Sequence, residues 1–250
     1  MISDGHIQEN AMKIIRNHGC SGIHAALLAC VSVWGAGCGA SAGKTDGQGN
    51  PAANPGTGQP GISAAKADKG PRSPELLKLE AMQVQTGVFD KPRTNEEAKY
   101  LEFQGSAFKS TDFDLLVALP NVERLGFNNL RPPIGDAGLR KLLPLKKINY
   151  LDLQSQEITS EGLEVLKGFP ELEHLYLAGN PIGDSGLPAL EAIPKLNWLS
   201  LEYCGSVTDQ GVPHLKKLTG LKVLALLKSG VSEAGRQELR AALPNCSVAP

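Results

Sequence analysis

Four side chains in one part of the sequence could carry out acid–base or metal chemistry. His174 lies between Asp152 and Glu202, with Cys204 shortly after Glu202. A histidine beside a carboxylate can act as a general base or hold a metal ion. The other histidines fall near the N-terminus or at His214, on the opposite side of the predicted fold, and neither G-x-S-x-G nor H-E-x-x-H occurs. We therefore expect no catalytic residue, no metal site and no small-molecule cofactor.

A second set of residues has the types that dominate protein interfaces. All four tyrosines of the chain, together with Trp198, fall beside the buried leucines of predicted strands or in the turn that follows. Tyrosine, tryptophan and arginine supply much of the energy of binding interfaces. A general preference of aromatic residues for exposed strands does not explain this, because other strand-flanking positions carry Lys, Glu or Asn. The predicted ligand-binding residues are Tyr100, Glu102, Arg124, Tyr150, Asp152, His174, Tyr176, Trp198, Ser200, Glu202 and Tyr203.

Within this set, we expect one patch near the middle of the sheet. Tyr150 and Trp198 share one strand position, and Tyr176 lies two residues further along its own strand. These side chains face away from the leucine core, so we expect them to be exposed. Asp152, His174 and Glu202 are expected to form a polar rim around them.

The strands that position these residues come from a repeated unit. Residues 98–246 contain six copies, which begin at residues 98, 122, 148, 172, 196 and 221. In each copy leucines such as Leu151 and Leu153 alternate with polar residues, as expected of a half-buried strand. An Asp, Ser or Glu follows, placed to cap a helix, and then a Gly. Apolar residues at helical spacing come next, and in four copies a proline ends the helix.

This unit resembles a leucine-rich repeat, because it starts with L-x-x-L-x-L and has a period in the twenties. Its length and the I-x-D-x-G-L pattern at Ile182 are similar to those of bacterial short-repeat proteins and of F-box-type substrate adapters. The resemblance implies an α/β solenoid of about six repeats, with a parallel sheet on the concave side and helices on the convex side. The repeat domain is assigned to residues 98–250, and residues 73–97 to a helix and strand that cap its N-terminal end.

Three local features depart from the regular repeat. The turn position that usually holds Asn or Cys is Gln156, Asn180, Cys204 and Ser229 in the last four copies. The second copy has a two-residue insertion at 131–133, where we expect a protrusion. Cys204 and Cys246 are too far apart in the solenoid to form a disulfide, and we expect both to be buried thiols, with Cys246 in a core position.

The first 37 residues resemble the signal peptide of a bacterial lipoprotein. Lys13 and Arg16 precede an uncharged run from 23 to 36, which is too short for a membrane span of roughly 20 residues. Small residues 35–37 then precede Cys38, the predicted lipidated residue, with Cys30 as the alternative. Residues 1–11 are acidic for a signal peptide, so the start is predicted at Met12. A plain secretion signal or an uncleaved anchor is the other interpretation.

Residues 38–72 are rich in Gly, Pro and Ala and contain almost nothing to bury. Such a segment does not offset the entropy cost of ordering, so we expect a flexible tether. A lipidated cysteine, a tether and then a folded domain is the usual order in a surface lipoprotein.

Charge and fold together narrow the function. The chain has 25 Lys plus Arg and 26 Asp plus Glu, a net charge of −1, which disfavours nucleic-acid binding. The sequence predicts a non-catalytic module, a monomer, that recognises a protein or glycan on its concave face. We expect it to be lipid-anchored in the bacterial cell envelope, on the periplasmic or surface side. The alternatives are an envelope spacer without a ligand and, less favoured because no F-box-like segment is present, a substrate adapter.

Overall fold

The computed structural model describes residues 72–85, 92–103, 108–109, 111–128 and 130–249. The predicted signal peptide, both candidate lipidation sites and the tether up to residue 71 lie outside the described residues. Within them, no helix has the length and apolar character needed to cross a membrane.

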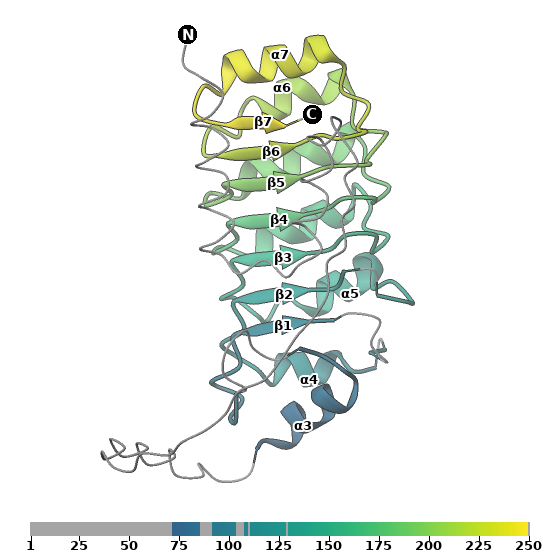
Figure 1. Cartoon of the computed structure of the whole chain (residues 1–250), viewed down its shortest axis with the longest axis vertical. Coiled ribbons are helices and arrows are strands. Elements are labelled where there is room, and N and C mark those ends of the chain that lie inside the picture. The colour runs from purple at the N-terminus through teal and green to yellow at the C-terminus, as the bar shows by residue number, and fades with distance from the viewer. Residues whose placement is uncertain (1–71, 86–91, 104–107, 110, 129, 250) are drawn as a thin grey trace, which may run out of the picture. The chain divides into compact units, whose positions relative to one another are not determined.

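Seven short parallel strands form one sheet in the order of the sequence (Figure 1). They are β1 (Tyr100–Glu102), β2 (Arg124–Gly126), β3 (Tyr150–Asp152), β4 (His174–Tyr176), β5 (Trp198–Ser200), β6 (Val223–Ala225) and β7 (Ser247–Ala249). The fold is the predicted α/β leucine-rich repeat solenoid. It has one strand more than the six predicted, because residues after the sixth copy pair with β6.

The last strand also corrects the prediction for Cys246. Val248 pairs with Leu224 in the parallel register and is buried at the leucine position. Cys246 therefore precedes β7 at the position of Lys222, and it is only partly buried. It packs against the edge of the core rather than inside it.

Short helices from successive repeats lie on one side of this sheet. They are α4 (Phe113–Val117), α5 (Gly135–Lys141), η2 (Gly162–Gly168), η3 (Asp184–Ala192), η4 (Asp209–Gly211), α6 (Val212–Leu215) and α7 (Glu233–Ala242). The elements labelled η are 3₁₀ helices, where the sequence predicted ordinary helices. The apolar residues of η3 and its C-terminal end, Leu187, Leu190 and Ile193, recur every third residue, which is the period of a 3₁₀ helix. The predicted prolines 170, 194 and 244 follow directly after the C-cap residues of η2, η3 and α7.

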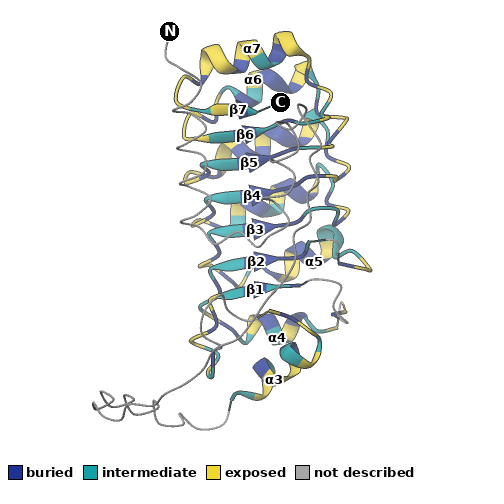
Figure 2. Ribbon diagram, viewed as in Figure 1, coloured by how far each residue is buried: buried dark blue, intermediate teal, exposed yellow. Residues whose placement is uncertain are grey.

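The core fills the space between the sheet and the helices (Figure 2). The central leucine of every strand from β1 to β6 is fully buried. Near the N-terminal end four phenylalanines pack together, with Phe103 and Phe127 stacked at 4.9 Å between ring centroids. Phe108 and Phe113 complete this group, with ring centroids 5.2 Å apart.

The N-terminal end of the repeats is covered by α3 (Pro74–Ala81), which buries Leu76 and Leu79. Of the predicted cap strand, residues 86–91 lie outside the described residues, and the described part forms an antiparallel bridge between Gln85 and Glu102. Its two backbone hydrogen bonds measure 2.9 and 3.0 Å.

The sequence predicted that the acidic residues at the helix starts cap their own helices, but they do not. Asp136 instead accepts hydrogen bonds from the backbone and hydroxyl of Thr159 in the next repeat, at 3.0 and 2.7 Å. Asp184 makes the same pair of bonds to Thr208, at 2.8 and 2.6 Å. Hydroxyls supply the side-chain caps that are present: Thr208 accepts from the backbone N–H of Gln210 and Ser232 from that of Gly235. These aspartates therefore join neighbouring repeats.

The turns after the strands are joined in a similar way. Asn180, which is buried, donates to the carbonyls of Leu153 and Leu177, both at 2.8 Å. Its Oδ1 accepts from the backbone N–H of Gln156 and Ile158. In the second copy the predicted insertion forms a turn in which residues 131 and 132 are exposed.

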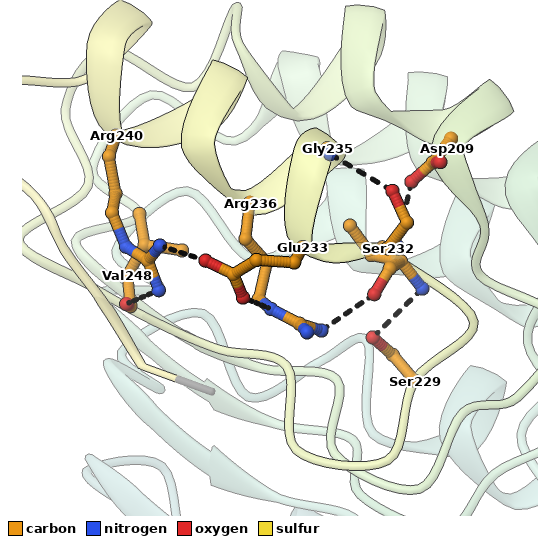
Figure 3. Close-up of polar contacts among 9 residues, drawn as sticks. Asp209, Ser229, Ser232, Glu233, Gly235, Arg236, Arg240 and Val248 are labelled. Carbon is orange, nitrogen blue, oxygen red and sulfur yellow. Dashed lines mark hydrogen bonds and ion pairs between the residues drawn. The ribbon is translucent and has the colours of Figure 1, made fainter.

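The C-terminal end is covered by α7, whose polar side chains tie it to the neighbouring turns (Figure 3). Arg236 and Arg240 both pair with Glu233, at 3.0 and 2.8 Å. The guanidinium of Arg236 also donates to the carbonyl of Val231 at 2.6 Å. Arg240 also donates to the carbonyl of Val248 in β7 at 3.5 Å, which joins the helix to the last strand.

Candidate recognition surface on the sheet

The strand register aligns the predicted site residues into two rows on the face away from the helices. The first row contains Tyr100, Arg124, Tyr150, His174, Trp198, Val223 and Ser247. The second row contains Glu102, Gly126, Asp152, Tyr176, Ser200, Ala225 and Ala249. The rows follow from the repeat, because equivalent residues of neighbouring repeats lie about 4.8 Å apart across a parallel sheet.

Four rings in the middle of these rows form an aromatic cluster, made of Tyr150, His174, Tyr176 and Trp198. The ring centroids of Tyr150 and Tyr176 lie 5.2 Å apart, and those of Tyr176 and Trp198 lie 6.0 Å apart. His174 lies 6.0 Å from both Tyr150 and Trp198. The tyrosines and tryptophan thus lie together as predicted, but His174 belongs to the cluster rather than to a polar rim.

The second row is more deeply buried than the sequence predicts. Tyr176 is 8% exposed, Asp152 6% and Ser200 2%, although all three point away from the leucine core. In this row Tyr176 lies between Asp152 and Ser200 on the two adjacent strands. Tyr176 is therefore packed into the sheet surface. Of the predicted polar rim, Asp152 is buried and Glu202 is half-buried.

The three carboxylates of the predicted site make local hydrogen bonds. Asp152 accepts from the backbone and side-chain nitrogens of Gln154, at 3.0 and 3.1 Å. Glu202 accepts from the hydroxyl of Ser200 at 3.2 Å. Glu102 accepts from the hydroxyl of Tyr100. These bonds fix the carboxylates at the edge where the strands end.

Arg124 lies between two tyrosines of the first row. Its guanidinium carbon is 4.3 Å from the ring centroid of Tyr150 and 5.9 Å from that of Tyr100. A cation over an aromatic face is stabilised by the ring quadrupole. The first row is therefore continuous from Tyr100 to Trp198.

Tyr203 extends the surface beyond the end of β5. It is 49% exposed and has a left-handed backbone, with φ of 58°. The ammonium of Lys228 lies 5.1 Å from its ring centroid. Reasoning from the sequence missed Lys228, although it occupies the same turn position as Tyr203 one repeat later.

The cysteines are poorly suited to nucleophilic chemistry. Burial raises the pKa of the Cys204 thiol, and its S–H donates to the carbonyl of Leu177 at 3.4 Å. Burial raises the pKa of Cys246 to about 11. Since the thiolate is the reactive form, burial disfavours the nucleophilic form of both groups. The described residues contain no group of three or more His, Cys, Asp or Glu side chains able to hold a metal ion.

Comparison with known proteins identifies one of the repeats. The family model for the leucine-rich repeat matches residues 171–190, which include β4. Among solved structures, an internalin from Listeria monocytogenes is 19% identical with a TM-score of 0.45, and the match covers 54% of this chain and 36% of that one. The C-terminal domain of tropomodulin from Caenorhabditis elegans is 14% identical with a TM-score of 0.42, over 50% of this chain and 84% of that one. No curated protein matches.

Proposed function

We propose that this protein is a non-catalytic recognition module that binds a protein partner on the face of its sheet that lies away from the helices, here called the outer face. The observation that carries this proposal is the aromatic cluster, which gathers large side chains in the middle of the two rows. Aromatic side chains on a rigid sheet provide contact area at low entropy cost, and such centres are where binding energy concentrates. A purely structural spacer needs no such cluster.

The ring packing favours a protein over a glycan. One face of the Tyr150 ring is covered by Arg124, and the ring also leans against Tyr176 and His174. The rings of the cluster are inclined to one another by 31–42°. Rings that lean on one another in this way leave less open face, whereas a sugar stacks on an open face. Aliphatic and aromatic side chains of a polypeptide fit such a surface better.

The N-terminal sequence supports a location for this activity. We place the protein in a bacterial cell envelope, anchored by lipid at Cys38, with the repeat domain held away from the membrane by the tether. Small residues before Cys38, basic residues before the uncharged run and the Gly/Pro-rich composition that follows all support this placement.

A paired capture experiment tests the proposal. The full chain and its Trp198→Ala variant serve as baits in envelope extract, and captured proteins are quantified by mass spectrometry. Trp198 is chosen over Tyr176 because it is less buried, so its truncation disturbs the sheet surface less. We expect the variant to bind its partner with a free energy at least about 1 kcal/mol weaker, roughly a fivefold loss of affinity.

Lys216→Ala is the matched control, because Lys216 lies on the helix side and pairs there with Glu238 at 2.7 Å. It should capture the same partner as the unmodified chain. Equal capture by the Trp198 variant would disprove the proposal. Loss of capture only with Lys216→Ala would also disprove it and would place binding on the helices.

A further inference from the structure

Arg124 has a feature that the packing of the sheet does not explain. Its Nε is buried and makes no hydrogen bond, and it is the one such side-chain atom in the described part of the chain. Buried polar groups in proteins are nearly always paired, so an exception calls for a physical cause. The two tyrosine rings that enclose the guanidinium offset part of its charge but provide no hydrogen-bond acceptor on this side.

The rest of the guanidinium remains available. Only Nε is both buried and unpaired, so Nη1 and Nη2 keep access to solvent. Among the described residues no carboxylate forms an ion pair with Arg124, whereas the neighbouring Lys99 pairs with Glu123 at 2.8 Å. Arg124 is also the one Arg or Lys in either row. The first row thus holds a positive charge in a fixed orientation and without a carboxylate partner.

Nearby carboxylates restrict where an anion can bind. Glu102 and Asp152 lie in the second row on the strands either side of β2, and Gly126 between them has no side chain. A Cβ at Gly126 would lie 3.6 Å from Glu102 and 3.7 Å from Asp152. An anion over the second row would therefore be repelled, while one over the first row meets the open edge of the guanidinium.

From this arrangement, and resting on the proposed function, we infer that Arg124 binds an Asp or Glu side chain of the partner polypeptide. A guanidinium presents paired N–H groups that match both oxygens of a carboxylate. Tyr100 and Tyr150 hold its plane in place, so little entropy is lost when the pair forms. Three strands separate Arg124 from Trp198, about 14 Å, which an extended peptide crosses in about four residues. The bound segment therefore carries an acidic residue about four positions from an apolar residue that contacts the aromatic cluster.

A display experiment with peptides of random sequence tests this inference. The peptide library, fused through its C-terminus so that only side-chain carboxylates are offered, is selected on the full chain and on Arg124→Gln, Arg140→Gln and Trp198→Ala. Arg140 is the matched control, because it is an exposed arginine of the same repeat on helix α5. We expect selection on the unmodified chain and on Arg140→Gln to enrich peptides with an acidic residue, and selection on Arg124→Gln to lose that enrichment.

The most enriched peptide is then synthesised and its affinity measured by fluorescence polarisation. Arg124→Gln should weaken binding roughly tenfold to a hundredfold, the usual range for a charged hydrogen-bonded pair. Replacing the acidic residue of the peptide by its amide should cause the same loss on the unmodified chain and no further loss on Arg124→Gln. Arg124→Lys, which keeps the charge without the planar pair of donors, should fall between.

The outcomes separate the two claims. Peptides that bind without acidic enrichment, or equal acid dependence in the unmodified chain and Arg124→Gln, would overturn the role of Arg124 and leave the recognition surface intact. If no peptide is selected, or if Trp198→Ala selects the same peptides, the proposed function fails and this inference fails with it. An unchanged urea unfolding midpoint shows that a variant is folded. If Arg124→Gln is not folded, the affinity of Arg124→Lys tests the role of Arg124 instead.

Discussion

At the scale of single residues, one turn position shows how the backbone limits the choice of side chain. Ser155, Gly179, Tyr203 and Lys228 occupy this position in successive repeats, and all have positive φ, between 54° and 69°. A left-handed backbone costs a residue with a Cβ roughly 1–2 kcal/mol, whereas glycine adopts it freely. Tyr203 therefore occupies a strained backbone position that these four repeats share.

A reciprocal pair of substitutions tests this strain. Gly179→Ala should lower the free energy of unfolding by about 1–2 kcal/mol, because alanine must adopt the left-handed backbone and its Cβ approaches Ser155 Oγ at 3.0 Å. Ser155→Gly should raise the free energy of unfolding by up to about 1 kcal/mol, because it relieves the same strain. Urea denaturation of the full chain measures both. Changes of the same sign in the two variants would show that backbone strain does not control this position.

At the scale of elements, neighbouring repeats interlock where a glycine faces an acidic side chain. A Cβ at Gly162 would lie 2.0 Å from Asp136 Oδ1, and one at Gly235 would lie 2.4 Å from Asp209 Oδ1. At these two positions the glycine therefore leaves room for the carboxylate of the preceding repeat. That carboxylate in turn bonds the backbone of the next repeat, at Thr159 in the case of Asp136.

This interlock predicts coupled mutational effects. Gly162→Ala should cost about 1–3 kcal/mol of unfolding free energy, as overpacking usually does. Combined with Asp136→Ala, its cost should be smaller than the sum of the single costs, because the clashing oxygen is gone. Gly205→Ala is the control, because nothing lies within 4 Å of a Cβ at that position. Additive costs in urea denaturation would mean that Gly162 is required for another reason.

The junction with helix α7 should depend on pH. Hydrogen bonds from the side chain and backbone of Ser232 lower the pKa of Asp209. Figure 3 shows these two residues side by side. Hydrogen bonds from Arg240 and Arg236 lower the pKa of Glu233 in the same way. A carboxyl whose pKa is lower in the folded state stabilises the fold above its unfolded pKa, and this contribution disappears as the pH falls through the folded pKa.

We therefore expect the urea midpoint of the full chain to fall between about pH 5 and pH 3, the range in which these carboxyls gain protons. Asp209→Asn should show a smaller fall over this range, since it cannot lose that charge. A midpoint that rises on acidification, or an equal fall in the variant, would contradict a stabilising role for the Asp209 carboxylate.

At the scale of the whole molecule, the repeats and the N-terminal sequence have separate tasks in our proposal. Each repeat packs against its neighbours, and α3 and α7 lie at the two ends of the stack. The first 72 residues contribute an address and a tether. A substitution in these 72 residues should therefore be able to change the location of the protein without changing its fold.

Cys38→Ser should move the full-length protein from the membrane fraction to the soluble fraction of a bacterial host, because the predicted lipid acceptor is lost. The measurement is fractionation followed by immunoblotting, with Cys30→Ser as the matched variant. Release by Cys30→Ser alone would identify Cys30 as the lipidated residue. Retention of both variants in the membrane would refute the lipoprotein interpretation.

The sequence alone determined the repeat, the strand register and the set of residues on the outer face. It could do so because strand alternation and repeat spacing are local patterns, and six copies repeat them: the placement of Leu175 in the core and of Tyr150 beside Tyr176 follows from counting. The three-residue spacing of the apolar side chains in η3 was also present in the sequence, although we expected an ordinary helix.

Only the tertiary structure decided how residues of different repeats meet. The burial of Tyr176 and Asp152, the bonds from Asp136 to the next repeat and the enclosure of Arg124 by two tyrosines all join residues about one repeat apart. Such contacts depend on how closely neighbouring strands and helices stack and on which rotamer each side chain adopts. Neither quantity is written in the alternation of apolar and polar residues, because that alternation sets the face on which a side chain lies and not its depth or its partners.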